Sequence, residues 1–233
     1  MFSIPGLIIG GSPRSGTSLL ISILSSHPGI YCIPEEAWAF YPTDHNDEFE
    51  AFVKRYLVPR LNEAGSSLSD YTIWCEKTPR NVLAFQNIIN FFGPEVRLIH
   101  LVRDGRDVIT SRHPHDPSRY WVSEAEWVWY VTEGLKFRAH PQVFTLKYEQ
   151  LVSQPTSTMS EIQEFLGLKE GFELSTWLEH STIQEHSAWY DGVRQIHAGS
   201  IGKWRDPVHA TTIKKFNQNE HARLLMESLE YEI

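Results

Sequence analysis

Residues 10–20 read GGSPRSGTSLL and join the apolar segment GLIIGG at 6–11 to a helical pattern at 16–27. The order predicts a buried strand, a short loop and a helix that ends before Pro28. A loop of this kind directs backbone N–H groups toward one point, at the positive end of the helix dipole. The segment therefore predicts an anion site at the end of the first strand.

The side chains of this loop also suit an anion. Gly16 lets the backbone approach a ligand closely, while Ser15, Thr17 and Ser18 offer hydroxyl donors. Arg14 brings a planar guanidinium that fits an oxyanion. A plain strand-to-helix turn with a serine cap uses the same residue types and stays open as an alternative.

Strand-like and helical segments alternate along the rest of the chain, which is typical of a parallel sheet covered on both faces. The sequence predicts an α/β, P-loop-like, three-layer fold with a central parallel sheet of about five strands flanked by helices, in a single domain over 1–233. Besides 6–11, strands are expected at 30–33, 71–75, 95–102 and 142–148, helices at 46–62, 79–92, 121–139, 156–166 and 219–229, and loops at 62–70 and 112–120.

Composition restricts the partners. The net charge of −8 and the lack of a basic run argue against a nucleic acid bound over a broad surface. No apolar run reaches the length of about 18 residues that suggests a membrane span, and we expect a cytoplasmic protein. The two cysteines, Cys32 and Cys75, form no metal-binding spacing and are expected to be free thiols.

A second anion site is predicted in LIHLVRDGRDVITSRH at 98–113. Arg103 follows the strand, and the carboxyl ends of parallel strands face the ligand crevice of an open α/β sheet. Ser111, eight residues later, is placed to bind the same oxyanion. Two anion sites on one sheet edge suit a nucleotide phosphorylated at both ends. The alternative is a surface turn in which the charges of RDGRD simply pair with one another.

The first loop resembles the phosphosulfate loop of sulfotransferases that use 3′-phosphoadenosine 5′-phosphosulfate (PAPS), in the PRSGT form of the bacterial and tyrosylprotein-sulfotransferase-like branch. Arg103 and Ser111 are similar to the family's 3′-phosphate site. By the same resemblance Tyr148 of FTLKYEQLVSQP contacts the adenine, and Lys203 of SIGKWR belongs to a late loop that closes over the nucleotide.

The resemblance also implies catalytic residues. In YCIPEEAWAF at 31–40, Glu36 is the match for the general base, with Glu35 as the alternative. Lys77 of WCEKTPRNV would stabilise the sulfuryl group in the transition state, and Arg14 would neutralise the departing phosphate. In the secreted branch a disulfide resembles a Cys32–Cys75 pairing, although reduced thiols are expected in a cytoplasmic chain.

The sequence therefore predicts a PAPS-dependent sulfotransferase that needs no metal and acts on a hydroxyl or amine of a small molecule, glycan or peptide. One alternative is a P-loop small-molecule kinase, but Thr17 stands where such a loop carries lysine. Another is a nucleotide-binding relative without activity. Neither the acceptor nor the oligomeric state follows from the sequence. Aromatic residues that would line an acceptor pocket or a core are Trp38, Phe40, Tyr41, Trp121, Trp127 and Trp129.

Overall fold

A computed structural model describes residues 4–40, 46–185 and 192–232. Its centre is a five-stranded sheet in the order β2-β3-β1-β4-β7, in which every neighbouring pair is parallel. This confirms the predicted α/β fold and its five-stranded sheet. The strands are β1 (Gly6–Gly11), β2 (Ile30–Cys32), β3 (Ile73–Lys77), β4 (Val96–Val102) and β7 (Val143–Lys147).

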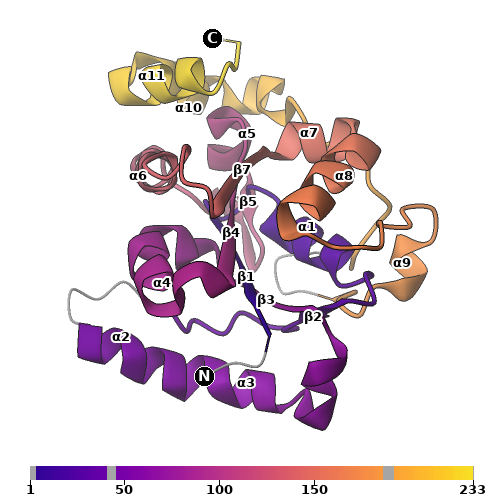
Figure 1. The fold of residues 1–233 in the computed structure, drawn as a ribbon. Coiled ribbons are helices and arrows are strands. Elements are labelled where there is room, and N and C mark those ends of the chain that lie inside the picture. Colours follow the sequence, from indigo (N-terminus) through magenta and orange to yellow (C-terminus); the bar gives the residue numbers. More distant parts are fainter. Residues whose placement is uncertain (1–3, 41–45, 186–191, 233) are drawn as a thin grey trace.

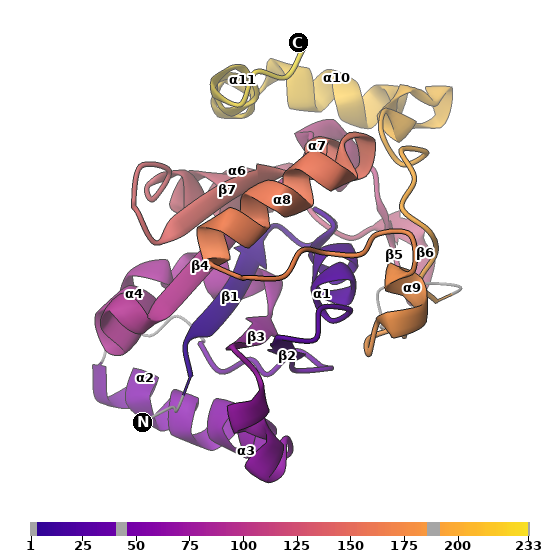
Figure 2. The same ribbon diagram turned by 45° about the vertical axis from the view of Figure 1, so that its right-hand side comes forward.

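Helices cover both faces of the sheet (Figures 1 and 2). Successive side chains of a strand point to opposite faces, so β1 contributes Leu7 and Ile9 to one buried cluster and Ile8 to another. The first cluster includes residues of α1 (Thr17–Leu24) and α8 (Pro155–Leu166). The second includes residues of α4 (Phe85–Phe92) and of α6 (Glu124–Leu135). The result is the predicted three-layer arrangement.

A third apolar cluster attaches the C-terminal helices to the sheet. Trp127 of α6, Phe216 and Met226 are buried there beside Val102, the last residue of β4. The two C-terminal helices lie together at one end of the molecule (Figure 1). The elements of this region are α5 (Gly105–Ile109), α7 (Tyr148–Ser153), α10 (Ala210–Gln218) and α11 (Glu220–Ser228).

Some predicted elements differ in detail. The expected loop at 112–120 is an antiparallel ribbon, β5 (Arg112–His113) with β6 (Asp116–Tyr120). Pro117 is tolerated because the ribbon has only two strands, so the residue is on an edge. The expected helix at 46–62 is divided into α2 (Asn46–Phe52), a π-helical segment (Val53–Leu57) and α3 (Val58–Asn62). Short helical segments complete the chain: Gly65–Asp70, Pro79–Ala84, Gly93–Glu95, α9 (Trp177–His180), Lys203–Arg205 and Pro207–His209.

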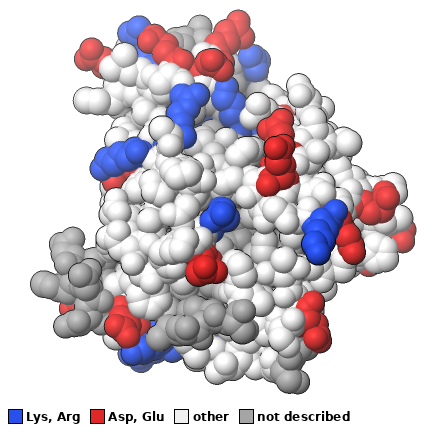
Figure 3. All heavy atoms as spheres, viewed as in Figure 1, with Lys and Arg blue, Asp and Glu red and all other residues white. Residues whose placement is uncertain are grey.

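The surface carries both signs of charge. Figure 3 shows basic and acidic side chains interspersed over the face drawn, with no extended region of one sign. Among the described residues, no helix combines the length and the apolar character that crossing a bilayer requires.

Candidate functional site

The predicted functional residues gather at one edge of the sheet. The loop 12–16 follows β1, Lys77 ends β3, Arg103 follows β4 and Tyr148 follows β7. Glu36 lies four residues beyond the end of β2. Because all five strands are parallel, their carboxyl ends lie on the same side, where open α/β sheets bind their ligands.

The loop after β1 is a tight turn fixed by Ser15. Its backbone N–H and its hydroxyl both donate to the Ser12 carbonyl oxygen, over 3.1 and 2.6 Å. Ser15 is fully buried, so its hydroxyl serves the turn. Gly16 has φ +98°, and a Cβ there would lie 2.5 Å from the Tyr148 ring. Glycine is therefore required, and no side chain caps α1 at this position.

Glu36 and Lys77 form an ion pair between neighbouring strand ends. The Lys77 Nζ lies 2.5 Å from Glu36 Oε1. The Lys77 side chain is 2% exposed and that of Glu36 is 20% exposed, so the pair is largely shielded while the carboxylate still reaches the cleft. Glu35 is 78% exposed and lies 3.7 Å from Arg60. The geometry thus favours Glu36 over Glu35 as a base beside the lysine.

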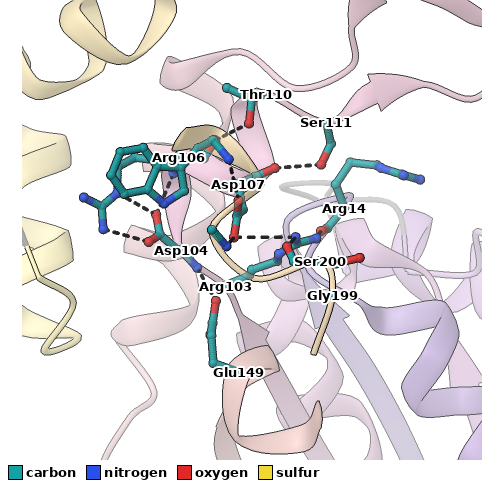
Figure 4. A network of polar contacts seen from close by, with 12 residues as sticks. Arg14, Arg103, Asp104, Arg106, Asp107, Thr110, Ser111, Glu149, Gly199 and Ser200 are labelled. Carbon is teal, nitrogen blue, oxygen red and sulfur yellow. Dashed lines mark hydrogen bonds and ion pairs between the residues drawn. The ribbon is translucent and has the colours of Figure 1, made fainter. Parts of the chain in front are cut away.

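Arg103 connects the two predicted anion sites (Figure 4). Its Nη1 donates to the carbonyl oxygen of Arg14 over 3.0 Å, and its Nη2 donates to that of Ser200 over 2.5 Å. The guanidinium also lies 3.7 Å from the Asp107 carboxylate and 4.5 Å from the centre of the Tyr148 ring. Arg103 therefore contacts the β1 loop, Tyr148 and the late segment around Ser200.

Asp107 anchors that late loop, residues 199–205. Its buried carboxylate accepts hydrogen bonds from the backbone N–H groups of Gly202, over 2.8 Å, and Trp204, over 3.0 Å. The Ser111 hydroxyl donates to the Asp107 carbonyl oxygen over 2.7 Å, and Ser111 is not among the residues that line the cleft. No role was predicted for Asp107, although its place four residues after Arg103 on a helical turn was a usable signal.

The remaining charges of RDGRD, Asp104 and Arg106, pair with each other, as expected for a salt-bridged turn. Arg106 donates from Nε and Nη2 to the Asp104 carboxylate over 3.0 and 2.7 Å. The Asp104 backbone N–H donates to Glu149, whose pKa is raised by burial. The Arg106 guanidinium covers the Trp204 ring at 4.1 Å. These contacts brace the turn that presents Arg103 (Figure 4).

A cleft of about 1590 Å³ runs along this edge of the sheet. It is lined by the predicted residues Arg14, Gly16, Thr17, Ser18, Glu35, Glu36, Arg103, Tyr148 and Lys203, and by Trp38, Arg80, Trp121 and Tyr130. Ser15, Lys77 and Ser111 are predicted site residues that do not line it. Of the other aromatic candidates, Phe40 and Trp127 are buried in the core, Trp129 is exposed and Tyr41 lies outside the described residues.

The two cysteines lie side by side on the neighbouring strands β2 and β3. Cys32 of β2 is in register with Cys75 of β3, and both are free, buried thiols. Burial raises the pKa of Cys75 well above its usual value.

A family model described as "Sulfotransferase family" matches residues 5–173. A putative protein-tyrosine sulfotransferase of Caenorhabditis briggsae is 25% identical, over 91% of this chain and 84% of that protein. The protein-tyrosine sulfotransferase of Drosophila melanogaster is 26% identical over 70% of this chain, and the match spans only 38% of the fly protein.

Solved structures share the fold. The sulfotransferase domain of the Synechococcus PCC 7002 olefin synthase superposes with a TM-score of 0.66 and 19% identity, over 99% of this chain and 96% of that domain. A mouse sulfotransferase complexed with PAP gives a TM-score of 0.58 and 16% identity, over 96% of this chain and 88% of that one. At such identities the likeness concerns the fold.

Proposed function

This chain belongs to the sulfotransferase family, and from that premise we propose which of its residues carry out the reaction. The enzyme transfers a sulfuryl group from PAPS to an acceptor and releases 3′,5′-bisphosphoadenosine (PAP). The observation that supports the assignment is that Arg14, Arg103 and Glu36 line one cleft, and that the buried Lys77 pairs with Glu36 from behind its wall.

Glu36 acts as the general base. It accepts the proton of the acceptor hydroxyl as the acceptor oxygen forms its bond to sulfur, and the bond between sulfur and the 5′-phosphate oxygen breaks. Lys77, 2.5 Å from Glu36, offers a cation to the sulfuryl oxygens at the same place. Its burial makes that charge effective, because a shielded charge is little screened by water.

The β1 loop and Arg103 bind the donor. Arg14 neutralises the negative charge that grows on the departing 5′-phosphate, and the backbone around Gly16 supplies N–H donors. Arg103 fits a phosphate in one specific respect: its Nε is buried and has no hydrogen-bond partner among the described residues. An unsatisfied buried donor beside an anion loop suits an oxyanion ligand. Tyr148 and Lys203, which line the cleft, are proposed to complete the nucleotide site, with Ser111 supporting it through its hydrogen bond to Asp107.

The acceptor binds beside Glu36, in a cleft that Trp38 and Tyr130 also line; these two aromatic residues form the acceptor wall. Relatives of this chain carry the name protein-tyrosine sulfotransferase. Together with this aromatic wall, that name favours a phenolic hydroxyl as the acceptor group.

Ligand-dependent thermal stability tests the donor assignment. PAP, which binds only the folded protein, is expected to raise the melting temperature, whereas ATP with Mg²⁺ is expected to have little effect. Transfer of radiolabel from [³⁵S]PAPS to 4-nitrophenol or a tyrosine-containing peptide tests the reaction. Stabilisation by ATP–Mg²⁺ alone would indicate a kinase, and PAP binding without any transfer would indicate a non-catalytic relative.

A further inference from the structure

We propose that Glu76 is a positioning residue: it fixes the Glu36–Lys77 pair and, at the same time, Trp38 of the acceptor wall. The inference rests on the proposed roles of Glu36 and Lys77. Glu76 lies in β3 between Cys75 and Lys77 and is completely buried. It does not line the cleft, so it would act through its neighbours.

The Glu76 carboxylate binds three donors from different segments. Its Oε1 accepts from the backbone N–H of Ala37 over 3.0 Å and from the Thr78 hydroxyl over 2.6 Å. Its Oε2 accepts from Asn81 Nδ2 over 2.6 Å, and the same Nδ2 donates to the Ile9 carbonyl oxygen over 3.1 Å. The residue after Glu36, the residue after Lys77 and, through Asn81, the interior of β1 are thus tied to one buried group.

A second link reaches the acceptor wall through Thr78. The backbone N–H of Trp38 donates to Thr78 Oγ1 over 3.4 Å, while that hydroxyl donates to Glu76. Trp38 has φ +52°, a conformation that is strained for a bulky residue. The residue is nevertheless 47% exposed and lines the cleft. Such strain persists only where surrounding contacts enforce it, and the two hydrogen bonds to residues 37 and 38 provide that enforcement.

A carboxylate is the group that these donors require. Burial raises the pKa of Glu76, whereas its hydrogen bonds and the nearby Lys77 favour the charged form. Burying a charge in the sheet is costly, and an apolar side chain would suit a purely structural strand position better. Glutamine would present only one acceptor oxygen and would oppose its own NH₂ to that of Asn81. The buried charge is therefore explained by the donors that it orients around the active site.

The experiment compares three variants with the wild-type protein. Glu76→Gln changes the carboxylate that accepts the hydrogen bonds. Thr78→Val replaces only the hydroxyl, so the inference can still be tested if Glu76→Gln folds poorly. Thr158→Val is the matched control, because Thr158, on α8, is also a buried threonine whose hydroxyl donates to an oxygen, the carbonyl of Gln150. The measurements are kcat and the KM for PAPS with 4-nitrophenol as acceptor, and hydrogen exchange of the peptides that cover 35–40 and 10–18.

We expect Thr78→Val to lower kcat about tenfold and Glu76→Gln up to about 100-fold, with the KM for PAPS within about twofold, because a misplaced base impairs the chemical step. Exchange in 35–40 should accelerate about tenfold in both variants and stay unchanged in 10–18. In a Glu36→Gln background the losses should shrink, since the part that acts through Glu36 is already lost, whereas the part that acts through Lys77 and Trp38 remains.

Several results would overturn the inference. These are unchanged exchange in 35–40, equal acceleration in both peptides, a loss of kcat in Thr158→Val as large as that in Thr78→Val, or losses that add fully to that of Glu36→Gln. Failure of the proposed function looks different. Wild-type protein that binds PAP but transfers no label would contradict the catalytic assignment and, with it, this inference. An active wild type whose Glu76 and Thr78 variants behave like it would contradict the inference alone.

Discussion

Arg103 donates a hydrogen bond of 3.0 Å to the main-chain carbonyl oxygen of Arg14, so the two loops proposed to hold opposite ends of the donor touch each other directly. The Arg14 guanidinium itself extends away from this contact (Figure 4). It lies 5.5 Å from the centre of the Trp121 ring. Arg103 therefore holds the backbone of the loop, while the charge of Arg14 lies beside Trp121 in the wall of the cleft.

Replacing Glu36 by glutamine tests the general base. The change keeps the shape and removes the proton acceptor, so kcat should fall by roughly 10²–10⁴. PAP affinity, measured by calorimetry, should stay within about twofold, because the base does not hold the nucleotide. Glu35→Gln is the control: its side chain is 78% exposed and near full activity is expected. A larger loss in Glu35→Gln than in Glu36→Gln would reverse the assignment.

Replacing Arg14 by lysine tests whether the planar guanidinium is needed in addition to the positive charge. Lysine keeps the charge and can occupy the same backbone conformation, φ +70°, at similar strain, but it cannot bind a phosphate through two parallel donors. We expect kcat to fall by roughly 10²–10³ and PAP to bind more weakly. Arg119→Lys, at a site 63% exposed and paired with Asp116, controls for a general effect of arginine removal. Equal kinetics of the two variants would contradict the role of Arg14.

Much of this arrangement could be predicted from the sequence, because strand ends and turn residues are local features. GLIIGG and EVRLIHLV are continuous apolar runs, as strands buried on both faces require, and both strands match within a residue. Parallel strands then place Arg14, Lys77 and Arg103 on one edge. The single-domain organisation, the cytoplasmic location and the individual site roles remain predictions.

Other features depend on contacts between distant segments and gave no local signal. Glu76 follows apolar residues in a strand, and only the approach of Ala37 and Asn81 shows why a carboxylate stands there. The positive φ of Trp38 has no sequence marker, since glycine or asparagine usually signals that conformation. The β5–β6 ribbon was missed because its two prolines and polar residues are typical of loops.

Asp107→Asn tests the anchoring of the loop 199–205. Asparagine keeps one acceptor oxygen but removes the charge that the backbone N–H groups of Gly202 and Trp204 share. Hydrogen bonds to a charged group contribute about 1.5–3 kcal/mol, so PAP should bind roughly 10- to 100-fold more weakly if the loop closes over it. Calorimetry measures the affinity, and the exposed Asp116→Asn serves as control. If the loop 199–205 loosens while the affinity for PAP stays unchanged, Lys203 does not contact the nucleotide.

His100 predicts how stability depends on pH. Both ring nitrogens are buried without a partner among the described residues, and desolvation lowers the pKa from 6.5 to about 3. Between those values the unfolded chain binds a proton that the folded chain does not, so stability falls as the pH falls, by up to about 1.4 kcal/mol per pH unit. From pH 7 to pH 5 the contribution of this residue should decrease by about 2 kcal/mol.

His100→Leu isolates that contribution, because leucine has a similar volume and suits the apolar surroundings beside Phe85. Urea unfolding at pH 7 and pH 5 should show the wild-type protein losing about 2 kcal/mol more than the variant. His221→Gln, at an exposed position, should behave as the wild type. Other titrating groups contribute equally to both proteins and cancel in the difference. A parallel loss in wild type and His100→Leu would mean that water or a rearranged side chain stabilises the charged imidazole in the folded state.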